Sequence, residues 1–303
     1  MKIGIDIGGS HIACGIVEKN GNLIAKETRD IDINEIKEEK RTENLIIDII
    51  DNEIRILLEK YDYTKGDISK IGISVPGSPK GSRIRNLVNL NIKEFDIGKV
   101  LEEKYKTVVK YKNDGKCAGI AEKQYGSLKK YNDCIFLCLG TGVGSAVFLN
   151  GELLEPKQNP GFEFGHMIIE KNGNSCNCGK KGCFETYASM KRFKARAIKE
   201  LNLEANTEAE EVQNYIRKNI EKEKVKKFVD EYLENVSIGI ANIINIFEPE
   251  AIAFGGSFSY YEDIFLPILD EKLKDKIFNK DTKVRLLPAK LKNDAGIIGA
   301  TEI

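Results

Sequence analysis

The chain has 303 residues, which is long enough for two domains, each with a hydrophobic core of its own. Lysine plus arginine and aspartate plus glutamate both number 47, so no net charge draws the protein toward nucleic acid or an anionic membrane. The sequence shows neither the apolar core of a signal peptide nor an uninterrupted apolar run of about 18 residues. We therefore expect a cytoplasmic protein that acts on a small molecule.

The N-terminal part of the chain predicts a strand meander, then a helix, then two more strands. Asn20-Gly21 is a typical hairpin turn within the meander, and apolar residues at helical spacing mark the helix. Asn113 or Asp114 would cap the helix that follows the last of these strands. The expected strands are 2–7, 11–17, 23–28, 71–75 and 107–111, and the expected helices cover 45–58 and 114 to about 125.

The second part of the chain repeats this beginning. The segments IDIGGSHIACGIVEKNG and LCLGTGVGSAVFLNG share, in the same order, a strand, a glycine turn, a strand and Asn-Gly. The match predicts an internal duplication in which each hairpin opens its own lobe. The rest is mostly helical, and its longest amphipathic stretch indicates core packing. The expected strands are 134–139, 145–149, 251–254 and about 284–287, and the expected helices are about 185–201, 207–219, 222–247, 263–277 and from 293.

Glycine-rich turns follow three of the predicted strands, and their backbones can approach a phosphate or a nucleoside closely. Neither hairpin turn opens a helix, as a Rossmann or Walker loop does, so a dinucleotide-binding fold is disfavoured. A tight turn without a ligand is the alternative for each turn alone, whereas a matched pair favours phosphate binding. The candidate residues are Asp6, Gly8, Gly9 and Ser10 in the first turn, Gly140, Thr141 and Gly142 in the second, and Gly255 and Gly256 in the third.

Seven cysteines fall into two groups, and their odd number argues against a disulfide framework. Four of them lie in apolar surroundings, where a free thiol acts as a small hydrophobic group. The other three have C-x-C-x4-C spacing in a glycine-rich loop that follows a histidine, and together they suit a closed tetrahedral zinc site of the structural kind. Free or redox-active thiols are the alternative. The candidate zinc ligands are His166, Cys176, Cys178 and Cys183, and we expect the glycine turns to lie away from them.

The paired glycine turns, with an acidic residue in the first, resemble those of the superfamily of sugar kinases, heat-shock ATPases and actin. Within it, GFEFGH at 161–166 followed by CNCGKKGCFE at 176–185 looks like the signature of the ROK family. The resemblance covers nearly the whole chain and implies an actin-like, RNase H-like α/β fold of two lobes with an active-site cleft between them. It implies a small lobe at 1–115, rejoined by a helix at about 292–303, and a large lobe at 116–291 that carries the zinc loop.

The resemblance also implies an activity, the phosphorylation of a hexose by ATP with Mg²⁺. A hydroxyl that attacks a phosphoryl group needs a base nearby, and the family's Asn-Asp pair, matched by Asn113-Asp114, supplies a sugar ligand and then that base. Without the resemblance, the pair is an ordinary helix cap. The family further implies that His166 lines the sugar pocket and that the protein is a homodimer or homotetramer. The ring hydroxyls would be bound by Asn89, Asn113, Asp114, Glu163, His166 and Glu185.

Glucose, phosphorylated at its 6-hydroxyl, is the expected substrate. Mannose, N-acetylmannosamine, allose and fructose are alternatives, because family members share these motifs. Departures from the family pattern include Ser10 in place of the usual Thr, a third turn that ends in Gly-Gly-Ser, and no acidic residue after Pro76-Gly77.

Two functions of other classes compete with the kinase. Regulators of the same family carry a helix-turn-helix ahead of the first glycine turn, whereas here the kinase strand starts by residue 3, so we expect no DNA binding. A non-catalytic binder of sugar or nucleotide is disfavoured because Asp6, Asp114 and both hairpin turns are intact.

Overall fold

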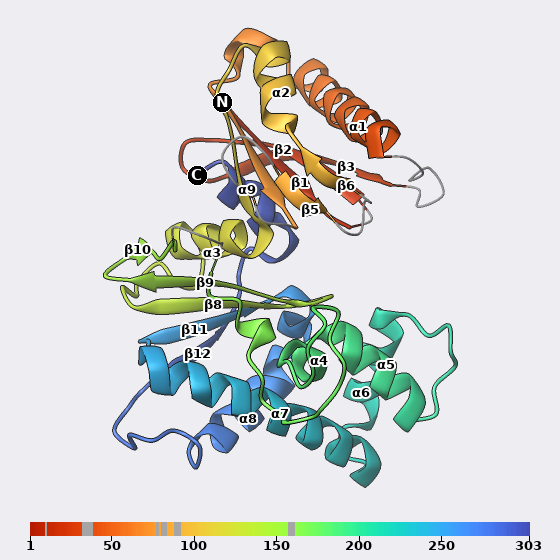
Figure 1. Ribbon diagram of the computed structural model, residues 1–303, viewed down its shortest axis with the longest axis vertical. Coiled ribbons are helices and arrows are strands. Elements are labelled where there is room, and N and C mark those ends of the chain that lie inside the picture. The colour runs from red at the N-terminus through yellow and green to blue at the C-terminus, as the bar shows by residue number, and fades with distance from the viewer. Residues whose placement is uncertain (10, 32–38, 77–78, 80–83, 88–91, 157–160) are drawn as a thin grey trace. The chain divides into compact units, whose positions relative to one another are not determined.

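The computed structural model describes residues 1–9, 11–31, 39–76, 79, 84–87, 92–156 and 161–303 (Figure 1). These residues form two compact units. The first unit comprises Met1–Lys129, Glu155–Gly161 and Asn293–Ile303, and the second comprises Lys130–Leu154 and Phe162–Lys292. The chain therefore enters each unit more than once.

A five-stranded mixed sheet forms the centre of the first unit, with the order β3-β2-β1-β4-β7. The first three strands make the predicted antiparallel meander, and β4 and β7 run parallel to β1. Because parallel strands end at the same edge of a sheet, the residues that follow β1, β4 and β7 are gathered at one edge. The strands are β1 (Lys2–Ile7), β2 (His11–Val17), β3 (Leu23–Asp30), β4 (Lys70–Val75) and β7 (Val109–Asn113).

Helices cover both faces of the first sheet (Figure 1). The helix α1 (Glu39–Lys60) buries an apolar stripe that includes Ile46, Ile50 and Ile54, as its helical spacing predicted. Together with α2 (Ile97–Tyr105), it lies on the face opposite α3 (Asp114–Gln124) and α9 (Ala295–Ala300). Neither α2 nor a small hairpin was among the elements predicted from the sequence. The remaining elements of this unit are β5 (Ile84–Leu87), β6 (Ile92–Phe95) and the 3-10 turn η2 (Lys65–Asp67).

The last helix packs so closely on the first sheet that its neighbours must be glycines. A Cβ atom on Gly72 would lie 1.7 Å from the carbonyl oxygen of Ala300, and one on Gly4 would lie 2.2 Å from that of Ile297. The helix α3 packs on α9 in turn. The first unit therefore continues through α3 to Lys129, whereas the sequence placed the boundary between the lobes after residue 115.

A second five-stranded sheet forms the centre of the second unit, with the order β10-β9-β8-β11-β12. Its β8, β9 and β10 form an antiparallel meander, and β11 and β12 run parallel to β8. The strand order and directions are those of the first sheet, which confirms the predicted repeat. The strands are β8 (Cys134–Leu139), β9 (Val143–Leu149), β10 (Glu152–Leu153), β11 (Ala251–Gly255) and β12 (Arg285–Pro288).

The helices of the second unit enclose one large hydrophobic core. The apolar face of α7 supplies much of it, as its pattern predicted. The helix predicted over 185–201 is divided at Ser189, whose backbone is extended, and the buried Tyr232 hydroxyl donates to the carbonyl of Ala188 at the break. The helices are α4 (Glu185–Ala188), α5 (Met190–Glu200), α6 (Ala209–Asn219), α7 (Glu223–Phe247) and α8 (Glu262–Leu273), with 3-10 turns η4 (Phe164–His166) and η5 (Gly256–Tyr261). The 3-10 turn η6 (Lys292–Asp294) lies where the chain returns to the first unit. No helix in the described part of the chain is both long and apolar enough to cross a membrane.

Candidate functional site

The first glycine turn begins beside a partly buried carboxylate, Asp6, at the carboxyl edge of the first sheet. The Ser74 hydroxyl, on the neighbouring strand β4, donates to Asp6 Oδ1 at 2.5 Å. Loss of hydration on burial raises the pKa of Asp6, although the Ser74 hydrogen bond and the charge of His11 act in the opposite direction. The turn itself is closed by the Gly8 amide, which donates to the carbonyl of His11 at 2.8 Å.

The raised pKa of Asp6 predicts how stability depends on pH. Above its ordinary value of 3.8, the unfolded chain ionises this group before the folded protein does, so stability falls as the pH rises toward the folded pKa. An Asp6→Asn variant has no carboxyl group to ionise at this position, so its stability does not fall in this way. Its stability gain over the wild type should therefore be largest at neutral pH and should vanish near pH 3, as measured by urea unfolding across this range.

A surface carboxylate supplies the control for this measurement. The hydrogen bond from Thr64 lowers the pKa of the exposed Asp67, so Asp67→Asn should show the opposite sign of pH dependence. A pH-independent difference between Asp6→Asn and the wild type would contradict the assignment of burial as the dominant effect.

The predicted Asn-Asp pair lies at the same edge of the first sheet, where β7 ends and α3 begins. The side chain of Asn113 accepts a hydrogen bond from the backbone amide of Lys116 at 3.3 Å, so the predicted helix cap is present. Asp114 is the first residue of α3 and is exposed. Strand pairing sets Asn113 beside Val75 of β4, whose Ser74 contacts Asp6. The candidate base and the acidic residue of the first turn therefore belong to one sheet edge.

Two of the predicted site residues, Ser10 and Asn89, lie outside the described residues. So do Gly77, Ser78 and Lys80 of the segment that departs from the family pattern.

The second and third glycine turns lie side by side at the carboxyl edge of the second sheet. Gly255 pairs with Cys138 where β11 and β8 end. The next residue, Gly256, has a φ of 68°, and a Cβ atom on it would lie 2.5 Å from the carbonyl oxygen of Leu139. Only glycine accommodates both conditions. The structure thus brings together all five residues predicted for these two turns.

A cavity of about 640 Å³ adjoins these turns within the second unit. Gly140, Thr141 and Ser257 line it at the turns, and residues of α5, α6 and η5 form its walls. Apolar side chains such as Met190 and Phe193 and polar ones such as Lys191 and Gln213 contribute to the lining. Ligand cavities generally measure about 300–1,000 Å³ and combine apolar walls with a few polar groups, so this one has the size for a nucleoside.

Hydrogen bonds from α6 connect it to η5, which forms another wall of this cavity. Gln213 and Arg217 of α6 each donate to the carbonyl oxygen of Tyr260 at 2.7 Å. The Arg217 guanidinium also binds both carboxylate oxygens of Asp263, at 2.6 and 2.8 Å. The sequence did not reveal α6 as part of a site, because its pattern is that of an ordinary amphipathic helix and its partners lie more than 40 residues away.

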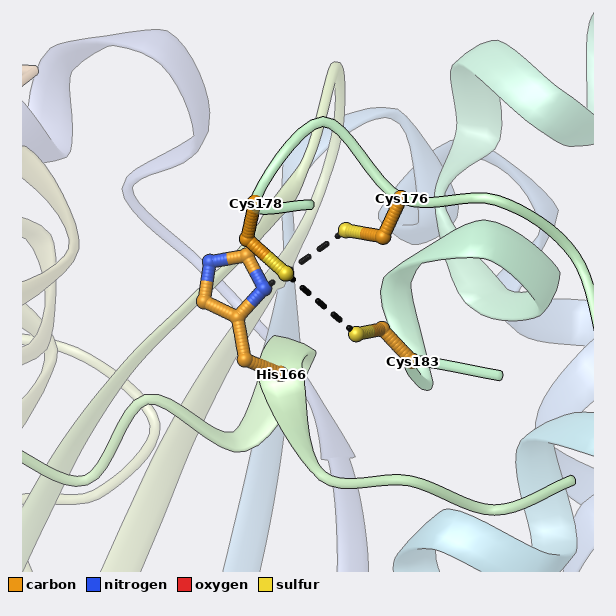
Figure 2. A group of neighbouring side chains, drawn as sticks. All are labelled: His166, Cys176, Cys178 and Cys183. Carbon is orange, nitrogen blue, oxygen red and sulfur yellow. Dashed lines mark hydrogen bonds between the residues drawn. The ribbon is translucent and has the colours of Figure 1, made fainter. Parts of the chain in front are cut away.

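The four predicted zinc ligands gather in the second unit, and their side chains point toward one another (Figure 2). Their donor atoms all lie within 4.8 Å of one another. Cys176 Sγ is 3.8 Å from His166 Nδ1, and Cys178 Sγ is 3.6 Å from Cys183 Sγ. The loop is shaped by backbone hydrogen bonds and by Gly182, whose φ is 79° and where a Cβ atom would lie 1.8 Å from the carbonyl oxygen of Glu170.

The cluster fits a zinc ion by its donors and its spacing. Ligand distances of about 2.0–2.3 Å in a tetrahedron imply separations of about 3.3–3.8 Å between donor atoms, close to the two short distances here. Three thiolates and one imidazole are the soft donor set that zinc prefers. No disulfide joins any of the seven cysteines, all of which lie within the described residues.

Two glutamates flank this cluster in sequence. Glu163 precedes η4, and Glu185 begins α4 two residues after Cys183. The Glu185 carboxylate accepts the backbone amide of Val143 at 3.0 Å, directly after the second glycine turn. The expectation that the glycine turns lie away from the cysteine loop is therefore wrong for the second turn.

The comparisons with known proteins agree over the whole chain. The ROK family model matches residues 2–303. A glucokinase of Thermotoga maritima is 28% identical over 319 aligned residues, which cover 99% of this chain and 96% of that enzyme. A xylose repressor of Bacillus subtilis is 27% identical, over 100% of this chain and 76% of the repressor.

A solved structure of a related protein has a similar fold. The ROK family glucokinase from Streptomyces griseus, in complex with glucose and AMPPNP, matches with a TM-score of 0.81 and 23% identity, covering 99% of this chain and 98% of that one. This likeness confirms the predicted α/β fold of the actin-like ATPases. On the family match across its full length, the chain belongs to the ROK family.

Proposed function

We propose that the protein is an ATP-dependent sugar kinase that phosphorylates a hexose, with glucose as the leading substrate, at the 6-hydroxyl. The proposal rests on one feature of each unit, described separately. An exposed carboxylate, Asp114, lies at one sheet edge with Asp6, and a cavity of nucleoside size adjoins two glycine turns at the other. The similarity to the Thermotoga maritima glucokinase supports it.

In the proposed reaction, the oxygen of the sugar hydroxyl attacks the γ-phosphorus of ATP. The P–O bond to ADP breaks, and the hydroxyl proton passes to a carboxylate oxygen of Asp114. A hydroxyl is a weak acid, so this transfer comes late, as the new P–O bond forms. Asn113 is fixed by its bond to the Lys116 amide, which holds the start of α3 and thus the position of Asp114.

The nucleotide is proposed to occupy the cavity of the second unit. Its base would contact the apolar wall, and its phosphates would meet the backbone of Gly140, Thr141 and Gly142. Asp6 fits a role toward Mg²⁺, because a carboxylate whose charged form is disfavoured by burial is stabilised by a nearby cation. Mg²⁺ bound with ATP would neutralise charge on the phosphates.

The sugar is proposed to be bound through its hydroxyls, and a site of this kind rejects analogues that leave its polar groups unpaired. The proposed ligands of the sugar are Asn89, Asn113, Asp114, Glu163, His166 and Glu185. Zinc, held by His166 and the three clustered cysteines, would fix the loop that carries the last three of these side chains. Four protein donors complete a tetrahedral shell, so we assign zinc a structural role.

An ADP-release assay across a panel of hexoses tests the proposal. The protein with Mg-ATP should release ADP in a saturable, sugar-dependent manner, fastest with one of glucose, mannose, N-acetylmannosamine, allose or fructose.

A sugar-sensing regulator is the second candidate function, because the Bacillus subtilis xylose repressor matches the whole of this chain. A regulator without kinase activity would bind a sugar, detectable by calorimetry, and release no ADP with any member of the panel. That result would contradict the kinase proposal.

A further inference from the structure

The second glycine turn is held in place by the segment that follows the cysteine loop. Within the turn, the Gly140 amide donates to the carbonyl oxygen of Gly142. On one side, Glu185 Oε2 accepts the amide of Val143 at 3.0 Å, and on the other, the Lys191 amide donates to the carbonyl oxygen of Gly140 at 3.2 Å. Residues 185–191 therefore hold both ends of the turn.

Close packing shows that the Glu185 contact is built into the local sequence. A Cβ atom on Gly142 would lie 2.5 Å from Glu185 Oε2, so any larger residue there would displace the carboxylate. Gly165, next to His166, also packs against this strand, since a Cβ atom on it would lie 2.9 Å from the carbonyl oxygen of Val143. The segment that carries the first candidate zinc ligand thus contacts the same residue as Glu185 does.

The residues on either side of Glu185 are held in place by burial and by backbone hydrogen bonds. The preceding Phe184 is fully buried, and its amide donates to the carbonyl of Met167 at 2.7 Å. The carbonyl of Cys183 accepts both the amide and the hydroxyl of Thr186, at 2.9 and 2.8 Å. A displacement of Cys183 would therefore move Glu185, and with it the acceptor of the Val143 amide.

We propose that Glu185 is a positioning residue for the phosphoryl donor, which couples the cysteine loop to the phosphate-binding turn. This inference rests on the proposed function. It gives Glu185 a positioning role in addition to the sugar contact already assigned to it. Oε2 is engaged by the turn, which leaves Oε1 for a sugar hydroxyl. The carboxylate orients the Val143 end of the turn, so that the backbone amides of the turn keep the geometry that phosphate requires.

Measuring nucleotide binding in the absence of sugar separates the positioning role of Glu185 from its proposed contact with the sugar. ADP affinity is measured by calorimetry on the full chain for Glu185→Ala, Glu185→Gln and Glu163→Ala. Loss of a hydrogen bond to a charged acceptor should weaken ADP binding about tenfold in Glu185→Ala. Glu185→Gln retains an amide oxygen that can accept the Val143 amide, so its ADP affinity should stay within about threefold of the wild type. Glu163→Ala removes another proposed sugar ligand without touching the turn and should leave ADP affinity unchanged.

A second readout keeps this inference distinct from the proposed function. Hydrogen exchange at the Val143 amide should accelerate about tenfold in Glu185→Ala and remain slow in Glu185→Gln, whether or not the protein is a kinase. If the wild type binds no ADP, the proposed function fails, and with it the assignment to the phosphoryl donor. If the wild type binds ADP but Glu185→Ala binds it equally well, or if exchange at Val143 is unchanged, Glu185 does not position the turn and the kinase proposal stands.

Discussion

Asp114→Asn should lower kcat for hexose phosphorylation by at least about a hundredfold while the KM for ATP changes by less than about threefold. The amide has nearly the size of the carboxylate but cannot accept the hydroxyl proton. Asp114 is exposed and Asn113 provides the helix cap, so the variant should fold normally. Steady-state kinetics with the best hexose, together with thermal unfolding, measure both effects.

A second helix start in the same unit provides a matched control. The side chain of Asp96 caps α2 by accepting the amide of Lys99 at 3.2 Å, and it has no proposed catalytic role. Asp96→Asn should therefore leave kcat unchanged. Near-normal turnover in a folded Asp114→Asn variant would remove Asp114 from the mechanism.

Removal of one of the proposed zinc ligands should also have a large effect, on stability and on hexose binding. Cys178 is exposed, so Cys178→Ala removes a thiolate without opening a cavity in the core. We expect the variant to lose zinc as measured by elemental analysis, to unfold at a lower temperature, and to bind its hexose at least about tenfold more weakly. Because Glu185 follows the loop and contacts Val143, ADP affinity should fall as well, by a smaller factor.

A cysteine outside the loop tests whether the metal is responsible. Cys138 lies on β8 and is not one of the four clustered donors, so Cys138→Ala should retain the zinc content of the wild type. Wild-type protein purified without zinc, or a Cys178→Ala variant with an unchanged KM for its sugar, would contradict the structural zinc proposal.

Local patterns in the sequence sufficed for the elements that build the two sheet edges. The strands 2–7, 11–17 and 134–139 have the predicted bounds, because each is a short apolar run that stops at a glycine or a charged residue. The cap by Asn113 and the cluster of His166 with three cysteines were also predictable. Donor type and spacing fix such features with little help from the rest of the chain.

Features that depend on contacts distant in sequence were not predictable in this way. Glu185 and Val143 are 42 residues apart, and Arg217 and Tyr260 are 43 apart, so no local pattern indicates either contact. The helix α2 is a different case. Its apolar residues Ile97 and Leu101 are spaced by one helical turn after the capping Asp96, so a local signal for this helix is present in the sequence.

The identity of the product tests the central claim most directly. Wild-type protein is incubated with Mg-ATP and either glucose or 6-deoxyglucose, and the products are identified by mass spectrometry and phosphorus NMR. The kinase proposal predicts one glucose 6-phosphate for each ADP formed from glucose and no phosphorylated sugar from 6-deoxyglucose. Binding of sugars without any phosphorylated product, across the whole hexose panel, would contradict it.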